Sequence, residues 1–172
     1  MHADVTCYLY CCRHQFMDLS LLRQRGYNLM GDDLWYKDGL RFMCLQCGGC
    51  CSGFSGTVLV SAAEITVLAQ RLGIPETDFQ KRYTRAVGKG NISLIEKKNK
   101  DCIFFDKEVG CTVYSDRPRQ CRSWPFWRSN VYSPERWKRG AARCPGMDQG
   151  ESHDSEYIKQ VSDDDGSSGV VS

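Results

Sequence analysis

Apolar residues recur at helical spacing most clearly in the stretch that follows Ser61. Ser61-Ala-Ala-Glu64 matches a capping box, in which a serine hydroxyl and a glutamate carboxylate satisfy amide groups that a helix start leaves unpaired. The next apolar residues have the spacing of one helix face: Ile65, Leu68, Ala69 and Leu72. Gly73 is suited to the left-handed backbone of a helix end, so the pattern predicts a helix over residues 62–72.

Prolines and caps predict further, shorter helices. Pro75 begins one, and Ser133-Pro134 caps and begins another that ends near Ala142. A short helix is also expected over residues 116–121, which Trp124-Pro125 closes.

Short apolar runs separated by polar turns predict antiparallel strands. They are residues 34–42 with a central Asp-Gly turn, 58–60, 92–95, 102–105 and 111–114. The last two runs begin with Cys102 and Cys111. Neighbouring turns would bring these two thiols together at the strand ends.

The regular pattern covers only part of the chain. Residues 1–34 are interpreted as an N-terminal extension, with Met17 and Met30 as possible starts of a shorter product. Residues 35–158 are expected to form a cysteine-cluster metal-binding domain. The Asp, Gly and Ser content of residues 159–172 predicts a disordered tail, because it offers too little apolar surface to bury.

The composition is that of a globular protein with one core. The chain has 172 residues, of which 41% are hydrophobic and 11% aromatic. No stretch approaches the roughly 20 apolar residues of a membrane helix, and the N-terminus lacks the apolar segment of a secretion signal. We therefore expect a cytoplasmic protein with no membrane partner, and the net charge of +2 predicts no other partner.

The strongest chemical signal is Cys44-Leu-Gln-Cys-Gly-Gly-Cys-Cys51. Two-residue spacers let one loop direct several thiolates at a point, as a soft metal ion or an iron–sulfur cluster requires. Gly48 and Gly49 allow the backbone angles that such a loop needs. Cys50 and Cys51 are adjacent, so their side chains are expected to diverge, with one serving a second site or staying a reactive thiol.

Further cysteines follow singly, each beside a turn or a proline. With the loop they make eight candidate metal ligands: Cys44, Cys47, Cys50, Cys51, Cys102, Cys111, Cys121 and Cys144. Eight thiols would complete two four-sulfur sites. We expect Cys44, Cys47 and Cys50 to share a main site with one distant cysteine, and Cys51 to join the others in a second.

The chain has 11 cysteines, and thiols in a reducing compartment stay available as metal ligands. A secreted disulfide scaffold is the rival interpretation, but it would need an export signal and usually an even number of cysteines. Cys7, Cys11 and Cys12 lie in the extension. We interpret them as part of a loosely packed leader, with metal binding or lipid attachment as the alternative.

The cysteines are expected to bind either an iron–sulfur cluster or zinc. Zinc usually takes two Cys-x-x-Cys pairs, or one pair with histidines, and this chain offers no second separate pair. The spacing of Cys44, Cys47 and Cys50 is that of ferredoxin-type [4Fe–4S] loops, whose fourth ligand comes from elsewhere. An iron–sulfur cluster is therefore favoured, with zinc as the alternative.

Between Arg117 and Arg143 the chain carries eight basic residues against one acidic residue. Three of the arginines bracket Cys121: Arg117, Arg119 and Arg122. A four-thiolate site keeps negative charge, so these cations would stabilise it, although a solvated basic face accounts for them equally well. Tryptophans interleaved with the basic residues suggest nucleic-acid binding, but covering a metal core accounts for them better, so we expect no nucleic-acid partner.

Several short motifs occur in a fixed order: Trp35-Tyr-Lys-Asp-Gly-Leu-Arg-Phe42, the Cys44–Cys51 cluster, Cys111-Thr-Val-Tyr114, Arg117-Pro118, Cys121-Arg122, Trp124-Pro125-Phe126 and Cys144-Pro-Gly146. Together they resemble the YkgJ-like CxxCxxCC cysteine-cluster family over residues 35–158. The resemblance implies a zinc- or iron-chelating domain. Some relatives of this kind are labelled flagellin lysine N-methylases.

We therefore predict an α+β fold, a small single domain of short helices and short antiparallel strands organised around cysteine-ligated metal. Its function is interpreted as binding of an iron–sulfur cluster or zinc, in an electron-transfer or accessory module whose protein partner the sequence does not identify. Two alternatives stay open: a cluster-dependent enzyme, either an oxidoreductase or a protein lysine N-methylase, and a zinc-stapled interaction domain. No catalytic residue is assigned, because the chain has no nucleophile elbow, phosphate loop or HExxH helix.

Overall fold

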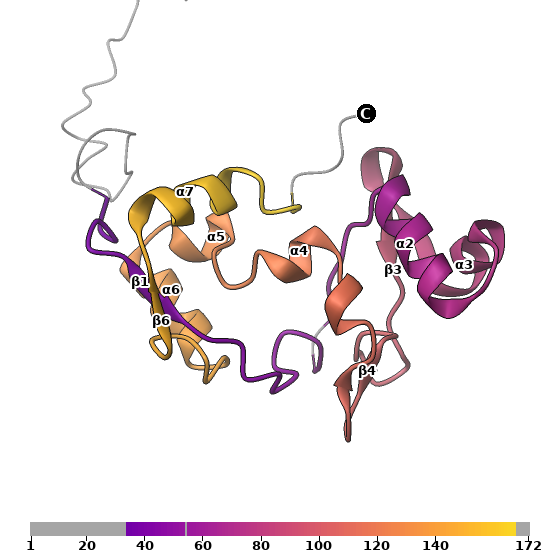
Figure 1. Cartoon of the computed structure of the whole chain (residues 1–172), viewed down its shortest axis with the longest axis horizontal. Helices are drawn as coiled ribbons and strands as arrows, with labels where there is room; N and C mark the ends of the chain where they lie inside the picture. The colour runs from indigo at the N-terminus through magenta and orange to yellow at the C-terminus, as the bar shows by residue number, and fades with distance from the viewer. Residues whose placement is uncertain (1–33, 54, 168–172) are drawn as a thin grey trace, which may run out of the picture. The chain divides into compact units, whose positions relative to one another are not determined.

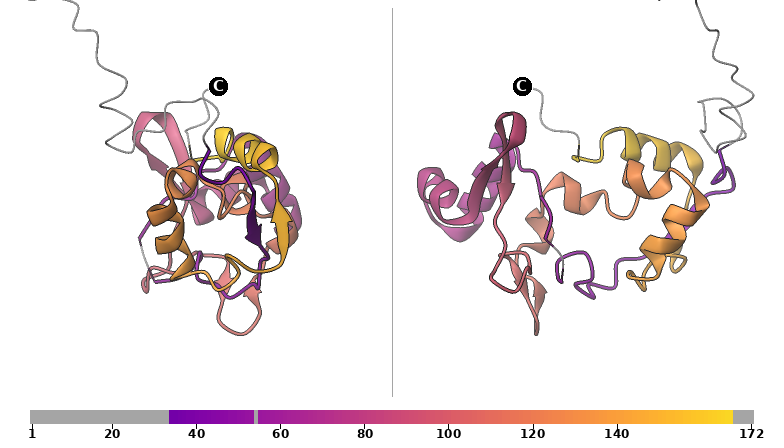
Figure 2. Two further views of the ribbon diagram at one scale, coloured as in Figure 1. Left: turned by 90° about the vertical axis from the view of Figure 1, so that its left-hand side faces the viewer. Right: turned by 180° about the vertical axis from the view of Figure 1, so that it is seen from behind.

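The computed structural model describes residues 34–167 except Phe54. The interpretations of Cys7, Cys11 and Cys12, and of residues 168–172, lie outside this range. Within it, the chain forms one small domain of short helices and short antiparallel strand pairs, as the sequence predicts (Figure 1, Figure 2). None of the described helices is both long enough and apolar enough to span a bilayer.

The strands within the described range form separate two-stranded antiparallel sheets. They are β1 (Leu40–Phe42) with β6 (Glu151–His153), β2 (Thr84–Val87) with β3 (Asn91–Leu94), and β4 (Phe105–Asp106) with β5 (Gly110–Cys111). In the first pair Leu40 lies opposite His153, so the two ends of the domain meet in one ribbon. In the second pair Thr84 lies opposite Leu94.

The helices of the described range are short. They are α2 (Ala62–Leu72), α3 (Glu76–Tyr83), α4 (Arg119–Arg122), α5 (Arg128–Val131), α6 (Pro134–Ala141) and α7 (Ser155–Asp163), with 3₁₀ turns at Gly88–Gly90 and Tyr114–Asp116. The predicted helix over residues 62–72 is confirmed: Ser61 and Glu64 form both bonds of the capping box, and Gly73 ends α2 with a positive φ. The cap of α6 by Ser133 is confirmed as well.

The predicted strands over residues 102–105 and 111–114 are largely wrong. Cys102 makes only an isolated bridge to Glu96, and Cys111 ends β5 instead of beginning a strand. The pairing is short because Asp106 turns the chain by accepting hydrogen bonds from the amides of Glu108 and Val109. Beyond β5 the backbone leaves the extended region and enters the 3₁₀ turn.

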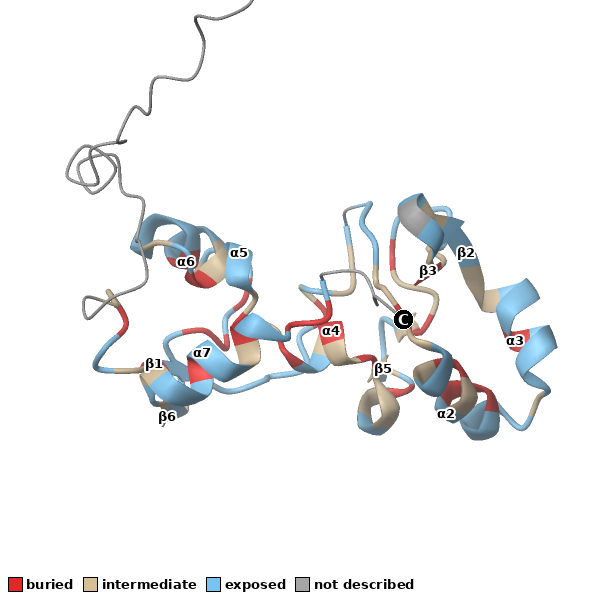
Figure 3. Cartoon of the chain, turned by 90° about the horizontal axis from the view of Figure 1, so that it is seen from above, coloured by how far each residue is buried: buried red, intermediate tan, exposed pale blue. Residues whose placement is uncertain are grey.

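Buried hydrophobic side chains form two clusters. Figure 3 colours the buried residues red along the backbone. The first joins β1, α5, α6 and α7: Tyr36, Leu40, Phe126, Val131, Trp137, Cys144, Met147 and Ile158. The second joins α2, α3, β3 and the segment around β4 and β5: Val60, Ile65, Leu68, Ala69, Phe79, Leu94, Phe104 and Val113. Helix α4 lies between the two groups of elements (Figure 1).

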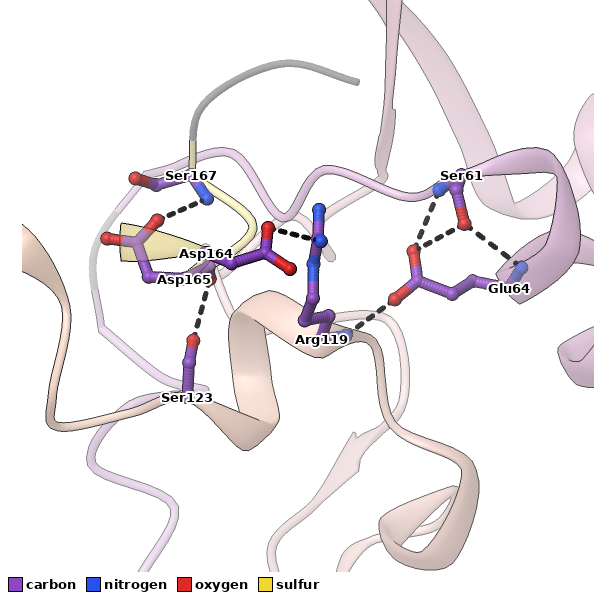
Figure 4. Close-up of polar contacts among 7 residues, drawn as sticks. All are labelled: Ser61, Glu64, Arg119, Ser123, Asp164, Asp165 and Ser167. Carbon is purple, nitrogen blue, oxygen red and sulfur yellow. Dashed lines mark hydrogen bonds and ion pairs between the residues drawn. The ribbon is translucent and has the colours of Figure 1, made fainter. Parts of the chain in front are cut away.

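The C-terminal segment differs from the composition-based expectation. Residues 159–163 continue α7, and Ser162 and Asp165 are buried. The backbone carbonyl of Asp165 accepts a hydrogen bond from Ser123 Oγ at 2.6 Å (Figure 4). The Asp165 carboxylate accepts one from the amide of Arg128 at 2.9 Å. Hydrogen bonds to residues at the end of α4 and in α5 therefore hold this C-terminal segment in place, although it has few apolar side chains to bury.

Candidate metal centre

All eight cysteines that the sequence singles out as ligands line one cavity of about 80 Å³. They come from four places in the fold: the loop after β1, the segment around β4 and β5, helix α4, and the turn after α6. The expected division into a main site with Cys44, Cys47 and Cys50 and a second site with Cys51 stays a prediction, because all eight residues line the same cavity.

The cysteine loop is built on close backbone approaches. A Cβ added to Gly48, whose φ is +74°, would lie 2.3 Å from the Phe105 ring. A Cβ added to Gly49 would lie 2.7 Å from the carbonyl oxygen of Arg143. The loop therefore requires glycine at both positions, and these contacts hold it against β4 and against the residue before Cys144.

Cys50 and Cys51 do not diverge as expected. The amide of Cys51 donates to the carbonyl of Gly48 at 2.8 Å, which turns the backbone tightly. As a result the two Sγ atoms lie 3.6 Å apart. The two adjacent thiols are thus in contact, and both residues line the cavity.

The distant cysteines are attached to the loop through backbone contacts. The amide of Cys102 donates to the carbonyl of Cys51 at 2.7 Å, and the amide of Met43 donates to the carbonyl of Gly146 at 3.0 Å. Cys144 precedes Gly146 by two residues and accepts a hydrogen bond from Trp124 Nε1 at 3.4 Å. Segments far apart in sequence are therefore held around the cavity by contacts that involve no thiol–metal bond.

The thiols differ in exposure. Cys44, Cys47 and Cys50 are exposed, and Cys144 is buried. The remaining cavity cysteines are half-buried: Cys51, Cys102, Cys111 and Cys121. The cysteine loop thus supplies the exposed part of the cavity lining, and Cys144 belongs to its buried part.

Burial and neighbouring thiols shift the pKa values of the cavity cysteines in both directions. Burial raises the pKa of Cys121, and the neighbouring Cys102 and Cys50 thiols raise it further. The Cys51 thiol lowers the pKa of Cys50 to about 7 through their hydrogen bond, and the same contact raises the pKa of Cys51. A bound metal cation would lower the pKa of each thiol that it contacts, so its binding would release protons.

The arginines predicted to support the site divide into two groups. Arg117 and Arg122 line the cavity, and Arg122 Nη1 donates to the carbonyl of Arg117 at 2.5 Å. The Arg119 side chain instead forms an ion pair with Asp164 (Figure 4). The basic face is therefore only partly directed at the thiols.

Arg117 contains an unsatisfied donor. Its Nε is buried and has no hydrogen-bond partner among the described residues. A buried polar group without a partner costs about 1–3 kcal/mol. An anionic group bound by the thiols would supply the missing acceptor, so the residues around the cavity fit a thiolate-ligated centre.

The described residues contain no ready-made site for a single ion. No three Cys, His, Asp or Glu side chains within them are close enough together to hold one metal. His153, the one histidine in the described range, lies on β6 and packs between Phe126 and Tyr157. Sulfur is thus the ligand type that the cavity offers.

Sequence reasoning missed two residues of the site. Tyr114 lines the cavity and lies under the Arg117 guanidinium, whose carbon is 3.7 Å from the ring centroid. Trp124 donates to Cys144, although the pattern suggests only that it covers the core. The position of Tyr114 in Cys111-Thr-Val-Tyr114 is the signal that points to it.

Comparison with known proteins gives one family. The profile of the CxxCxxCC family, described as a "putative zinc- or iron-chelating domain", matches residues 43–152. The chain is similar to an uncharacterized protein of Methanocaldococcus jannaschii, with 33% identity over 92 residues. That match covers 53% of this chain and 48% of the relative, so the chain spans about half the length of the curated relative. No solved structure matches the chain significantly.

Proposed function

Because this chain belongs to the CxxCxxCC family of zinc- or iron-chelating domains, we propose that its cysteine-lined cavity binds an iron–sulfur cluster. The observation that carries this proposal is the meeting of eight thiols around one cavity. The proposed ligands are the residues that line it: Cys44, Cys47, Cys50, Cys51, Cys102, Cys111, Cys121 and Cys144.

Three features support a cluster over a single zinc ion. The cavity of about 80 Å³ is several times the roughly 10–15 Å³ that one water requires. No three thiols of the described residues are close enough together to hold one metal ion. Arg117 Nε has no acceptor among the described residues, and the sulfides of a cluster would provide one.

The role proposed for the domain is that of an electron-transfer or accessory module. A bound cluster supplies one-electron redox chemistry. The protein keeps the inner thiols dry, since Phe104 and Val113 belong to the buried core and also line the cavity. The exposed Cys44, Cys47 and Cys50 leave the other side open toward a partner.

An enzymatic role has one observation in its favour. A second cavity of about 350 Å³ shares Cys50, Cys51 and Cys102 with the first. That volume is at the lower end of the range typical of small-molecule sites, about 300–1,000 Å³. The cluster-dependent enzyme therefore remains the second candidate, with a ligand that approaches the thiols from this side.

Metal analysis of protein purified without oxygen tests the proposal. We expect iron and acid-labile sulfide in nearly equal amounts, with broad visible absorbance. Stoichiometric zinc in colourless protein would overturn the cluster and support the zinc-stapled interaction domain. Cys44→Ser and Cys121→Ser should lower the metal content, whereas Cys11→Ser, a change in the leader, should leave it unchanged.

A further inference from the structure

The Arg117 side chain is held in place by its surroundings. Its guanidinium carbon lies 3.7 Å from the centroid of the Tyr114 ring, so the guanidinium group stacks on the aromatic face. Both residues line the cysteine cavity. Stacking satisfies the flat face of the group and leaves its edge, where the N–H groups lie, for hydrogen bonding.

The Nε–H edge has no acceptor in the described protein. Arg117 Nε is the single buried side-chain nitrogen or oxygen without a hydrogen-bond partner within the described residues. Buried donors in native structures are nearly always paired. Arg117 lines the cysteine cavity, so an acceptor bound there would pair this donor.

Arg117 lines the same cavity as thiols from three different segments. They are Cys50 of the loop, Cys111 of β5 and Cys121 of α4. A cation beside cysteines favours their thiolate form, which is the form that binds metal. Arg117 is thus placed beside the loop, β5 and α4 together.

We propose that Arg117 Nε–H donates a hydrogen bond to a sulfur of the bound cluster and that its charge offsets the negative charge of the thiolate-ligated centre. This inference rests on the proposed function. Tyr114 is the positioning residue, because its ring fixes the plane of the guanidinium group. Arg122 assists by donating to the carbonyl of Arg117.

The test is the reduction potential of the bound cluster in two Arg117 variants. Arg117→Met removes the donor and the charge but keeps a long apolar stem, and Arg117→Lys keeps the charge without the planar Nε–H. Hydrogen bonds to cluster sulfurs and nearby positive charge both raise the potential, since they stabilise the more negative reduced form. We expect a downward shift in Arg117→Met and a smaller downward shift in Arg117→Lys.

Arg128→Met is the matched control, because Arg128 is exposed and lines none of the cavities described above. Anaerobic redox titration followed by visible absorbance measures all four proteins. If Arg117→Met has the wild-type reduction potential, or if Arg117→Lys has it, the proposed hydrogen bond from Arg117 Nε is refuted. If Arg117→Met does not retain the cluster, the reduction potential of Arg117→Lys tests the proposal: a downward shift supports it, and the wild-type value refutes it. Wild-type protein without iron and sulfide would instead refute the proposed function itself.

Discussion

Glu64 Oε1 accepts a hydrogen bond from the backbone amide of Arg119 at 2.6 Å, so the carboxylate that caps α2 also satisfies the start of α4 (Figure 4). The other oxygen, Oε2, accepts from the amide of Ser61 at 2.8 Å. Helix α4 carries Cys121. A single carboxylate therefore connects the most regular helix of the domain to a segment that supplies a cavity thiol.

Replacing Glu64 by alanine should destabilise the domain. The variant leaves the Arg119 amide and the capping box without an acceptor, which corresponds to about 1–3 kcal/mol of unfolding free energy. Glu156→Ala is the control, because Glu156 lies in the first turn of α7 but is exposed. Denaturant unfolding measures both variants, and equal losses in the two would contradict a connecting role for Glu64.

The same carboxylate predicts a pH dependence. Burial favours the neutral acid, but hydrogen bonds from Ser61 and Arg119 outweigh it and lower the pKa of Glu64 below its ordinary value of 4.5. A group whose pKa is lower in the folded state stabilises fully above the unfolded value, and that contribution disappears as the pH falls through the folded value. The difference in unfolding free energy between wild type and Glu64→Gln should therefore shrink as the pH falls below 4.5. A constant difference across this range would show that the carboxylate charge is not involved.

Gly48→Ala should impair the cysteine loop. The new Cβ would meet the Phe105 ring at 2.3 Å, and the φ of +74° is unfavourable for alanine. Gly53→Ala shares the positive φ, at +82°, but meets no atom within 4 Å, so it separates backbone strain from the steric clash. We expect faster loss of metal to a chelator in Gly48→Ala than in Gly53→Ala, and equal rates would disprove the importance of this contact.

Trp124→Phe should weaken metal retention without unfolding the domain. Phenylalanine keeps the aromatic packing but cannot donate to Cys144 Sγ, and loss of a hydrogen bond to a ligand typically costs about 10–100-fold in metal affinity. Trp35→Phe is the control, since Trp35 Nε1 donates to the carbonyl of Val131, away from the cavity. Competition with a coloured chelator compares the two, and similar affinities would assign the Trp124 bond a packing role alone.

Local signals predict much of this fold. The capping box at Ser61 and the Ser133-Pro134 start are confirmed because each depends on residues within one helical turn. The pairing of Leu40 with His153 could not be predicted, since it depends on contacts between opposite ends of the domain. The ordered conformation of residues 159–167 has a similar origin, because Asp165 is held by partners on Ser123 and Arg128.

The candidate site shows the same division. Spacing identifies the four thiols of the loop, because four thiols within eight residues are typical of metal sites and not of hydrophobic packing. The four cysteines that follow singly line the same cavity, as predicted from their number and not from their spacing. The contact between Cys50 and Cys51 could not be anticipated, since it results from the turn that Cys51 makes onto Gly48. The unpaired Nε of Arg117 has no sequence signal at all, because burial and missing partners exist only in the folded chain.

The most direct test of the thiol-bound centre is a count of protected cysteines. Protein purified without oxygen is alkylated before and after chelation, and mass spectrometry assigns each modified residue among the 11 cysteines. We predict that the loaded protein is modified at Cys7, Cys11 and Cys12, and that chelation first makes the solvent-exposed loop thiols Cys44, Cys47 and Cys50 reactive. Rapid modification of these loop thiols at the same rate with and without chelation would show that they hold no metal.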